Sequence, residues 1–287
     1  ISGKLVAYLL LATVSVHYYG IWIERIKSER DAALKLAEKE SKKALRAGYT
    51  RKSRLVLLMS AVTLVGTLLT LKYSPFFVTN INTLLCRFGF SFCLKIPSYA
   101  IPIGISFFTL QAVSYVFDVH RGEIKADGNL LRLALFMSFF PQIVEGPICR
   151  YEETATQLWN VKQIQFSNLK FGLQRILFGM MKKIVVADRL NPLIEEVFNH
   201  HENYHGGVIA LAALCYTVQL YMDFSGTMDA VCGTAEIFGV VMPENFQRPF
   251  FSKTISEFWK RWHVSLGAWF KDYIFYPLTM SKPMKNL

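Results

Sequence analysis

A single histidine, His263, stands in the segment of this 287-residue chain that offers the most chemistry. Tryptophans and cations precede it directly, as Trp259, Lys260, Arg261 and Trp262. An imidazole titrates near neutral pH and can take a proton from a hydroxyl group. Burial between the indoles and the two nearby cations would both disfavour the imidazolium, and so keep the ring neutral and able to act as a base. The alternative is an inert histidine, hydrogen-bonded in a helix at a membrane interface.

The helix that must position His263 has a well-marked beginning. Thr254 and Glu257 have the spacing of a capping box, which predicts that the helix starts after Thr254. An unbroken helix from there has about 22 residues and a length of ~33 Å. One side of this helix would then hold Ser256, Trp259, Lys260, His263, Gly267 and Phe270. Gly267 would leave room beside the imidazole for a thin substrate or for another helix.

Glu145 is a candidate to line a substrate tunnel. It lies where Pro141 and Gly146-Pro147 break a helix, and irregular backbone at membrane depth is tolerated only against protein or a water-filled cavity. Its partner in sequence would be Arg150. The pair either lines the tunnel or closes a bent helix as a structural ion pair.

Asp223 and Asp229 lie within an otherwise apolar stretch, where acidic residues are candidates for function. They are six residues apart and do not share a helix face, so they do not form a catalytic dyad. Hydrogen bonds to neighbouring helices are the favoured interpretation, and Asp223 is retained as a tunnel residue. Asn245, in a loop between two prolines before the histidine helix, is expected near the same tunnel.

The composition predicts a membrane protein. Hydrophobic residues make up 52% of the chain and charged residues 18%, against about 45–50% and about 25% in soluble domains. A hydrocarbon core of ~30 Å needs ~20 apolar residues, and residues 5–23 and 55–71 carry no charge. Further apolar stretches occupy residues 101–117, 133–144, 171–181, 208–222 and 255–278. They lack the alternation of barrel strands, which predicts an all-α, polytopic transmembrane bundle.

The net charge of +11 is concentrated in one segment. Residues 24–54 hold eleven Lys/Arg and five Asp/Glu between two apolar stretches. Positive loops stay on the cytoplasmic side, so this segment is predicted to be a cytoplasmic loop with a helical body that faces anionic lipid headgroups, rather than a nucleic-acid surface. Residues 72–100 hold only three cations and are expected to form a loop on the outer side.

The cysteines and the other histidines indicate no second kind of chemistry. The cysteines (Cys86, Cys93, Cys149, Cys215 and Cys232) lack CxxC spacing, which favours small buried hydrophobic residues, although Cys86 and Cys93 could pair outside the membrane. The histidine-rich run 199–205 is interpreted as a polar loop rather than a metal site, and His17 and His120 as structural. Serine hydrolase, zinc protease and nucleotide-driven pump motifs do not occur.

Both ends look truncated. The chain begins at Ile1 and runs directly into an apolar stretch, and it stops at Leu287. No repeat or linker divides it. We therefore expect one membrane-embedded domain over residues 1–287, incomplete at both ends.

Five motifs in order carry a resemblance to a known family. They lie at residues 101–122, 140–150, 219–226, 244–249 and 257–273. This series, within residues 96–278, resembles the membrane-bound O-acyltransferases (MBOAT) of the bacterial alginate O-acetylation type. The residues before 96 fit only in their pattern of apolar spans.

The resemblance implies a bundle of transmembrane helices around a funnel, with re-entrant pieces that line it. It also implies acyl transfer from a cytoplasmic thioester, acetyl-CoA or an acyl carrier, with no bound cofactor. His263 matches the histidine of the family's Arg-Trp-His motif. The family's other histidine, in a Leu-Trp-His-Gly-like motif, is absent from this sequence. The resemblance gives that absent residue the main catalytic role. We hypothesise that it acts as the base on the acyl acceptor, while His263 helps to hold the donor thioester or the intermediate.

The expected function is O-acetylation of an exported polysaccharide by a multi-pass protein of the bacterial plasma membrane. Expected partners are an extracytoplasmic acetyltransferase and the polysaccharide synthesis complex. D-alanyl transfer to teichoic acid is the alternative within the family. A transporter or an export scaffold is the non-enzymatic alternative, although the matching halves typical of many transporters are not visible.

Overall fold

The computed structural model describes residues 3–90, 92–99, 101–102, 104–143, 145–160 and 165–280, with side chains from residue 6 onward. The two ends, where the sequence suggests truncation, lie outside the described residues, as do Ile103 and Val144 of the motifs. The chain forms two compact units. Unit 1 comprises residues 1–139 and 150–155, and unit 2 comprises residues 140–149 and 156–287. The expectation of a single domain stays a prediction.

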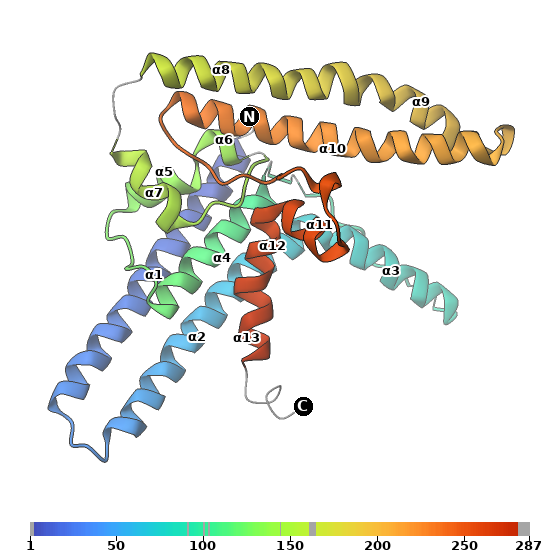
Figure 1. The fold of residues 1–287 in the computed structure, drawn as a ribbon. Helices are drawn as coiled ribbons and strands as arrows, with labels where there is room; N and C mark the ends of the chain where they lie inside the picture. The colour runs from blue at the N-terminus through green and yellow to red at the C-terminus, as the bar shows by residue number, and fades with distance from the viewer. Residues whose placement is uncertain are drawn as a thin grey trace. The chain divides into compact units, whose positions relative to one another are not determined.

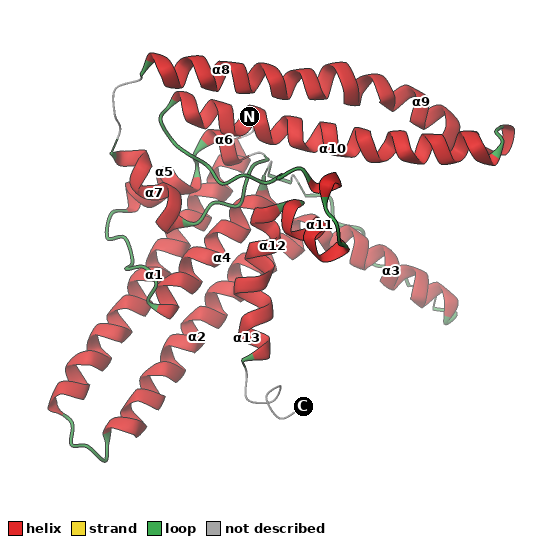
Figure 2. Cartoon of the chain, in the orientation of Figure 1, coloured by secondary structure: helices red, strands yellow, loops and turns green. Residues whose placement is uncertain are grey.

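The described residues are mainly helical and contain no strand (Figure 2), which confirms the all-α prediction. The helices before residue 160 are α1 (Gly3–Leu36), α2 (Lys42–Leu68), the π-helical segment η1 (Leu69–Tyr73), α3 (Ser74–Arg87), α4 (Ile105–Arg121), α5 (Leu130–Met137), α6 (Phe140–Ile143) and α7 (Tyr151–Trp159). Those that follow are α8 (Phe166–Met180), the π-helical η2 (Met181–Ala187), α9 (Asp188–Asn199), the 3₁₀ turn η3 (His201–Asn203), α10 (Gly206–Ile237), the 3₁₀ turn η4 (Pro249–Phe251), α11 (Ile255–Arg261), α12 (Val264–Phe270), the π-helical η5 (Lys271–Phe275) and α13 (Tyr276–Thr279).

Three stretches of the described chain are long and apolar enough to cross a membrane: Val6–Leu36, Lys42–Arg87 and Gly206–Ile237. Little of their apolar surface is covered by protein, and only 6% of the Gly206–Ile237 window is buried. Leu11, Leu58 and Leu214 are among the exposed apolar side chains. So large an apolar surface needs a bilayer to cover it. The chain is therefore a multi-pass membrane protein, as predicted.

In unit 1, α1 and α2 form a hairpin, and α4 packs against both (Figure 1). The basic segment 24–54 is thus the end of this hairpin, helical except for the turn at residues 37–41. The side chains of Val16, Ile23, Val56 and Tyr115 are almost fully buried in the core of the unit. Burial of apolar surface between the three helices stabilises this arrangement.

The expected outer loop at residues 72–100 is wrong for its first half, because helix continues through η1 and α3 to Arg87. Pro75 lies in the first turn of α3, directly after the π-helical η1, and the first turn is the part of an α-helix that best tolerates proline. Polar residues of α3 bond to their own backbone, as Asn80 Nδ2 does to Phe76 O at 2.8 Å, so they tolerate the helix. Cys86 and Cys93 are exposed free thiols, which corrects the expectation of burial for these two residues.

In unit 2, the α8–η2–α9 run lies antiparallel to α10 (Figure 1). Two glycines on each run, spaced seven residues apart, make the close contacts. Gly172 faces Gly233, and Gly179 faces Gly226. A Cβ added at Gly226 would lie 2.7 Å from Gly179 O, and one at Gly233 would lie 2.7 Å from Gly172 O. Small residues that let backbones approach closely are the usual device for packing apolar helices in lipid.

Replacing Gly226 with leucine should destabilise unit 2, because the new side chain would collide with the backbone of the α8–η2 run. Overpacking of this kind costs ~1–3 kcal/mol of unfolding free energy. Gly66→Leu is the matched control, since Gly66 lies in another apolar helix and no atom approaches its added Cβ within 4 Å. Unfolding in detergent measures both variants. Equal stabilities would contradict the importance of the glycine contact.

Candidate functional site

The helix expected over residues 254–276 begins as predicted but breaks at His263. Thr254 Oγ1 caps α11 by accepting from Glu257 N at 3.1 Å, and Glu257 pairs with Arg261. Trp262 is extended, and His263 adopts a left-handed conformation with φ 44° and ψ 55°. Few residues other than glycine take up this conformation. The prediction of one continuous helix is therefore wrong, and Trp259 and Lys260 do not share a continuous face with His263.

Asn245 fixes the backbone at the break between α11 and α12. Its backbone oxygen accepts from Val264 N at 3.0 Å, and its side-chain Oδ1 accepts from Ser265 N at 3.1 Å. Its Nδ2 donates to Met228 Sδ of α10 at 3.1 Å, and the residue is 1% exposed. A loop that precedes α11 thus satisfies the free N–H groups at the start of α12 and fixes the conformation of His263.

Ser265 connects the same break to the segment that contains Glu145. Its Oγ accepts from Ile148 N at 3.0 Å, and the bond is buried. Sequence analysis did not single out Ser265, because a serine two residues beyond a histidine carries no local signal. Together these bonds bring the motifs at 140–150, 244–249 and 257–273 to one point in unit 2.

The imidazole of His263 lies against α10. The ring of Phe224 meets it edge-on, with centroids 4.9 Å apart and planes at 83°. Nδ1 is buried and has no hydrogen-bonding partner in the part of the chain that the structure describes. Burial lowers the pKa of His263 to about 4, so the ring is neutral at pH 7, as predicted. The cause is burial alone, and the expected contribution of Lys260 and Arg261 is wrong.

Trp262 belongs to an aromatic cluster beside the break. It stacks on Phe258 with centroids 5.5 Å apart and meets Phe246 edge-on at 5.1 Å. Trp259, by contrast, is 61% exposed, and Lys260 is exposed too. The nearest atom to a Cβ added at Gly267 is Trp259 O, at 4.0 Å. The described residues therefore do not crowd Gly267, and the tunnel roles of these residues stay predictions.

Asp223 and Asp229 of α10 bond to the facing α8–η2 run, which confirms the favoured interpretation. Asp229 accepts from Arg175 Nε at 3.1 Å and from Lys182 Nζ at 2.6 Å. Asp223 pairs with Lys183. It also borders a pocket of about 390 Å³ lined by residues of α9 and α10, among them Asn191 and Gln219.

Glu145 lies near Asp223 and Lys183. Burial and then the negative charge of Asp223 raise the pKa of its carboxyl group, and Lys183 opposes them. The carboxyl therefore binds a proton more readily than an exposed glutamate does. Arg150, the partner expected from the sequence, belongs to unit 1, and the Glu145–Arg150 pair stays a prediction.

Comparison with known proteins decides the family. The sequence profile of the membrane-bound O-acyltransferase family, MBOAT, matches residues 67–286. The chain belongs to this family. It is 36% identical over 229 residues to the "Probable alginate O-acetylase AlgI" of Pseudomonas aeruginosa, which covers 80% of this chain and 44% of that protein.

Two further MBOAT relatives have other substrates in their names. The "Peptidoglycan O-acetyltransferase" of Helicobacter pylori is 31% identical over 251 residues, which covers 78% of this chain and 47% of that protein. The "Teichoic acid D-alanyltransferase" of Bacillus subtilis is 34% identical over 195 residues, which covers 64% and 48%. The chain thus spans about half the length of these relatives. All three come from bacteria.

The lowered pKa of His263 predicts a pH dependence of stability. The pKa of an unperturbed histidine is about 6.5, and that of His263 in the folded chain is about 4. Between these two pH values the unfolded chain binds a proton at His263 that the folded chain does not. The free energy of unfolding therefore rises with pH across this window and falls as the solution is acidified. His263→Gln should remove up to one proton from this dependence. Unfolding midpoints at pH 4–7 measure it, and identical profiles would contradict burial of the ring.

Proposed function

We propose that this chain is part of an integral membrane O-acyltransferase that acetylates an exported polysaccharide. The donor is a cytoplasmic thioester, acetyl-CoA or an acyl carrier, and the acyl group crosses the membrane within the protein. The observation that carries the proposal is the convergence on the neutral, half-buried His263 of Asn245, Ser265 and Phe224 from separate family motifs. The names of the alginate and peptidoglycan relatives support acetyl transfer to a polysaccharide.

The reaction places two demands on the protein. The acceptor oxygen attacks the thioester carbonyl carbon, a C–O bond forms, the C–S bond breaks, and the hydroxyl proton passes by way of a base to the leaving thiolate. The protein must therefore take up the hydroxyl proton and stabilise the oxyanion. A neutral imidazole has one N–H donor and one nitrogen acceptor. His263 donates to the carbonyl oxygen of the donor or intermediate, and the family's second histidine serves as the base on the acceptor.

The other predicted residues line the acyl path in this proposal. Trp259, Trp262 and Gly267 supply its apolar wall, and Lys260 and Arg150 attract an anionic donor. Glu145 and Asp223 form its polar side with Asn245, which also positions His263. A narrow, dry passage limits hydrolysis of the activated acyl group. An extracytoplasmic acetyltransferase would receive the group and pass it to the polysaccharide.

The test is restoration of polymer acylation in a strain that lacks the gene for the full-length protein. Acetyl esters on the isolated surface polymer are expected with the wild-type gene and not with an empty vector. D-alanyl esters in place of acetyl esters would overturn the acetyl assignment and support the second candidate, which the 34% identity to a D-alanyltransferase favours. Loss of polymer export, with no transfer of label from acetyl-CoA, would overturn the enzyme and support a transporter or scaffold.

A further inference from the structure

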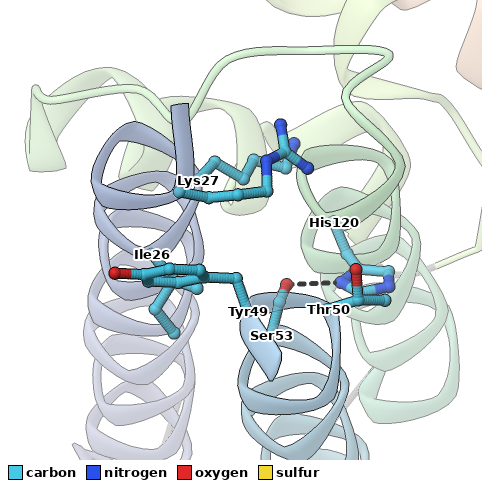
Figure 3. A pocket seen from close by; sticks show the side chains of 7 residues that line it. Ile26, Lys27, Tyr49, Thr50, Ser53 and His120 are labelled. Atoms are coloured by element: carbon cyan, nitrogen blue, oxygen red, sulfur yellow. Dashed lines mark hydrogen bonds between the residues drawn. The ribbon is translucent and has the colours of Figure 1, made fainter. Parts of the chain in front are cut away.

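A small cationic pocket lies among α1, α2 and α4 in unit 1 (Figure 3). Its volume is about 90 Å³. One buried water needs about 10–15 Å³, whereas pockets for drug-sized ligands measure about 300–1,000 Å³. The size fits one compact oxyanion and excludes a whole nucleotide or lipid. The lining residues are Ile26, Lys27, Arg30, Tyr49, Thr50, Ser53 and His120.

The charge at the pocket is positive. Lys27 and Arg30 lie one turn apart on α1, and none of the lining residues is acidic. Lys27 Nζ donates to Val119 O near the end of α4, and Arg30 Nε donates to Asp31 Oδ1 at 2.9 Å. The first bond holds Lys27 at the pocket and leaves it two further N–H donors, whereas the pair with Asp31 offsets part of the charge of Arg30.

The pKa of His120 indicates the same positive charge at the pocket. Its pKa is lowered, first by burial and then by the charges of Lys27, Arg54 and Arg121. Three cations therefore act on the ring from α1, α2 and α4. Of these, Arg121 also pairs with Glu123 at 3.5 Å. An anion placed in the pocket would relieve this repulsion between cations.

Neutral donors complete the lining. Ser53 Oγ lies 2.7 Å from His120 Nδ1 (Figure 3), and one of the two groups donates to the other. The ring of Tyr49 forms part of the wall, and its hydroxyl points away from Ser53 and His120 (Figure 3). The hydroxyl of Thr50 is used by Arg46 O, at 2.7 Å. Ammonium, guanidinium and hydroxyl groups that surround a small space are typical of a phosphate site.

The position of the pocket along α1 and α2 indicates which source of phosphate could reach it. The charge-free stretch of α1 ends at Ile23, and that of α2 begins at Leu55. The lining residues of both helices lie within about seven residues of these limits, or ~10 Å along a helix. Lipid headgroups occupy this level at the cytoplasmic surface, where the positive segment 24–54 is expected.

We propose that this pocket binds the phosphate group of an anionic membrane lipid. A water-soluble phosphate, such as one on a nucleotide thioester donor, offers the same chemistry, but it would have to enter at headgroup depth. The pocket lies in unit 1, shares no lining residue with the residues assigned to acyl transfer, and does not depend on the proposed function.

The experiment is a titration of the full-length protein, purified in a neutral detergent, with short-chain phosphatidylglycerol. Phosphatidylcholine, inorganic phosphate and adenosine 3′,5′-bisphosphate are titrated in parallel, and the thermal midpoint is read. The double variant Lys27→Gln/Arg30→Gln should weaken the apparent affinity for phosphatidylglycerol at least tenfold. The control Lys39→Gln/Lys43→Gln removes the same charge from exposed positions at the hairpin end and should change it less than threefold.

A second pocket variant guards against loss of folding, because Lys27 ties α1 to α4. Arg30→Gln alone leaves that bond in place and should still weaken lipid binding severalfold. Equal losses in the pocket and control variants would show only diffuse attraction to anionic surfaces and overturn the site. Equal binding of phosphatidylcholine would overturn it as well. Stabilisation by the soluble phosphates that matches that by the lipid would overturn the lipid as the source.

Discussion

Replacing His263 with alanine should lower acyl transfer by a factor of ~10²–10⁴, the usual contribution of one acid–base or oxyanion-stabilising group. The imidazole is the titratable side chain at the break between α11 and α12, and burial keeps it neutral. Its buried Nδ1 has no partner among the described side chains. A polar nitrogen left in this state costs about 1–3 kcal/mol, which a ligand that bonds to the ring would recover. The measurement is the number of acyl esters per polymer repeat, at matched levels of protein in the membrane.

Two comparisons separate chemistry from folding. His263→Asn keeps a polar side chain that tolerates the left-handed conformation, so the backbone break should survive while activity is lost. His200→Ala is the matched control, because it deletes an exposed histidine on the turn between α9 and α10 and should leave activity unchanged. Acylation at the wild-type level in His263→Ala would remove the residue from the site.

The elements that sequence predicted well are those with a local cause. Charge-free runs of membrane length became parts of α1, α2 and α10, since length and composition alone decide whether a helix can span lipid. The capping box at Thr254 likewise starts α11, because the bond joins residues three apart. The position of Asp229 within an apolar helix favoured hydrogen bonds to a neighbouring helix, and Arg175 and Lys182 donate them.

The break at His263 had no such local cause. Residues 255–270 contain no proline and read as one helix by composition. The bonds that fix Val264 and Ser265 come from Asn245, about twenty residues earlier, and from Ile148, more than a hundred residues earlier. Tertiary bonds of this kind override helix propensity and leave no periodic pattern in the sequence. Sequence therefore named the histidine but missed Ser265 and Phe224 beside it.

Asp229→Asn should destabilise unit 2 by ~3 kcal/mol, because it removes the carboxylate that both Arg175 and Lys182 bind. Breaking a buried ion pair costs about 3–5 kcal/mol, since the partner charge remains buried. The lower end applies here, as the three side chains keep 14–25% of their exposure. Asp223→Asn is the matched control on the same helix. Its pair with Lys183 is about half exposed and should contribute about 0–1 kcal/mol.

The same variant should also disturb the histidine site. Arg175 binds Asp229 and, through Nη2, Glu244 Oε2 at 2.6 Å, and Glu244 directly precedes the Asn245 that holds the break. Loss of Asp229 leaves Arg175 held by Glu244 alone, which weakens the anchor of this loop to α8. The residue to probe is Gln247, which bonds to Arg261 O through its backbone N–H at 3.0 Å. In a variant without the native cysteines, labelling of the thiol of Gln247→Cys should become faster with Asp229→Asn but not with Asp223→Asn. Equal labelling rates, together with a stability loss, would show that the ion pairs hold α8 to α10 without fixing the loop, and that Asn245 positions His263 independently of them.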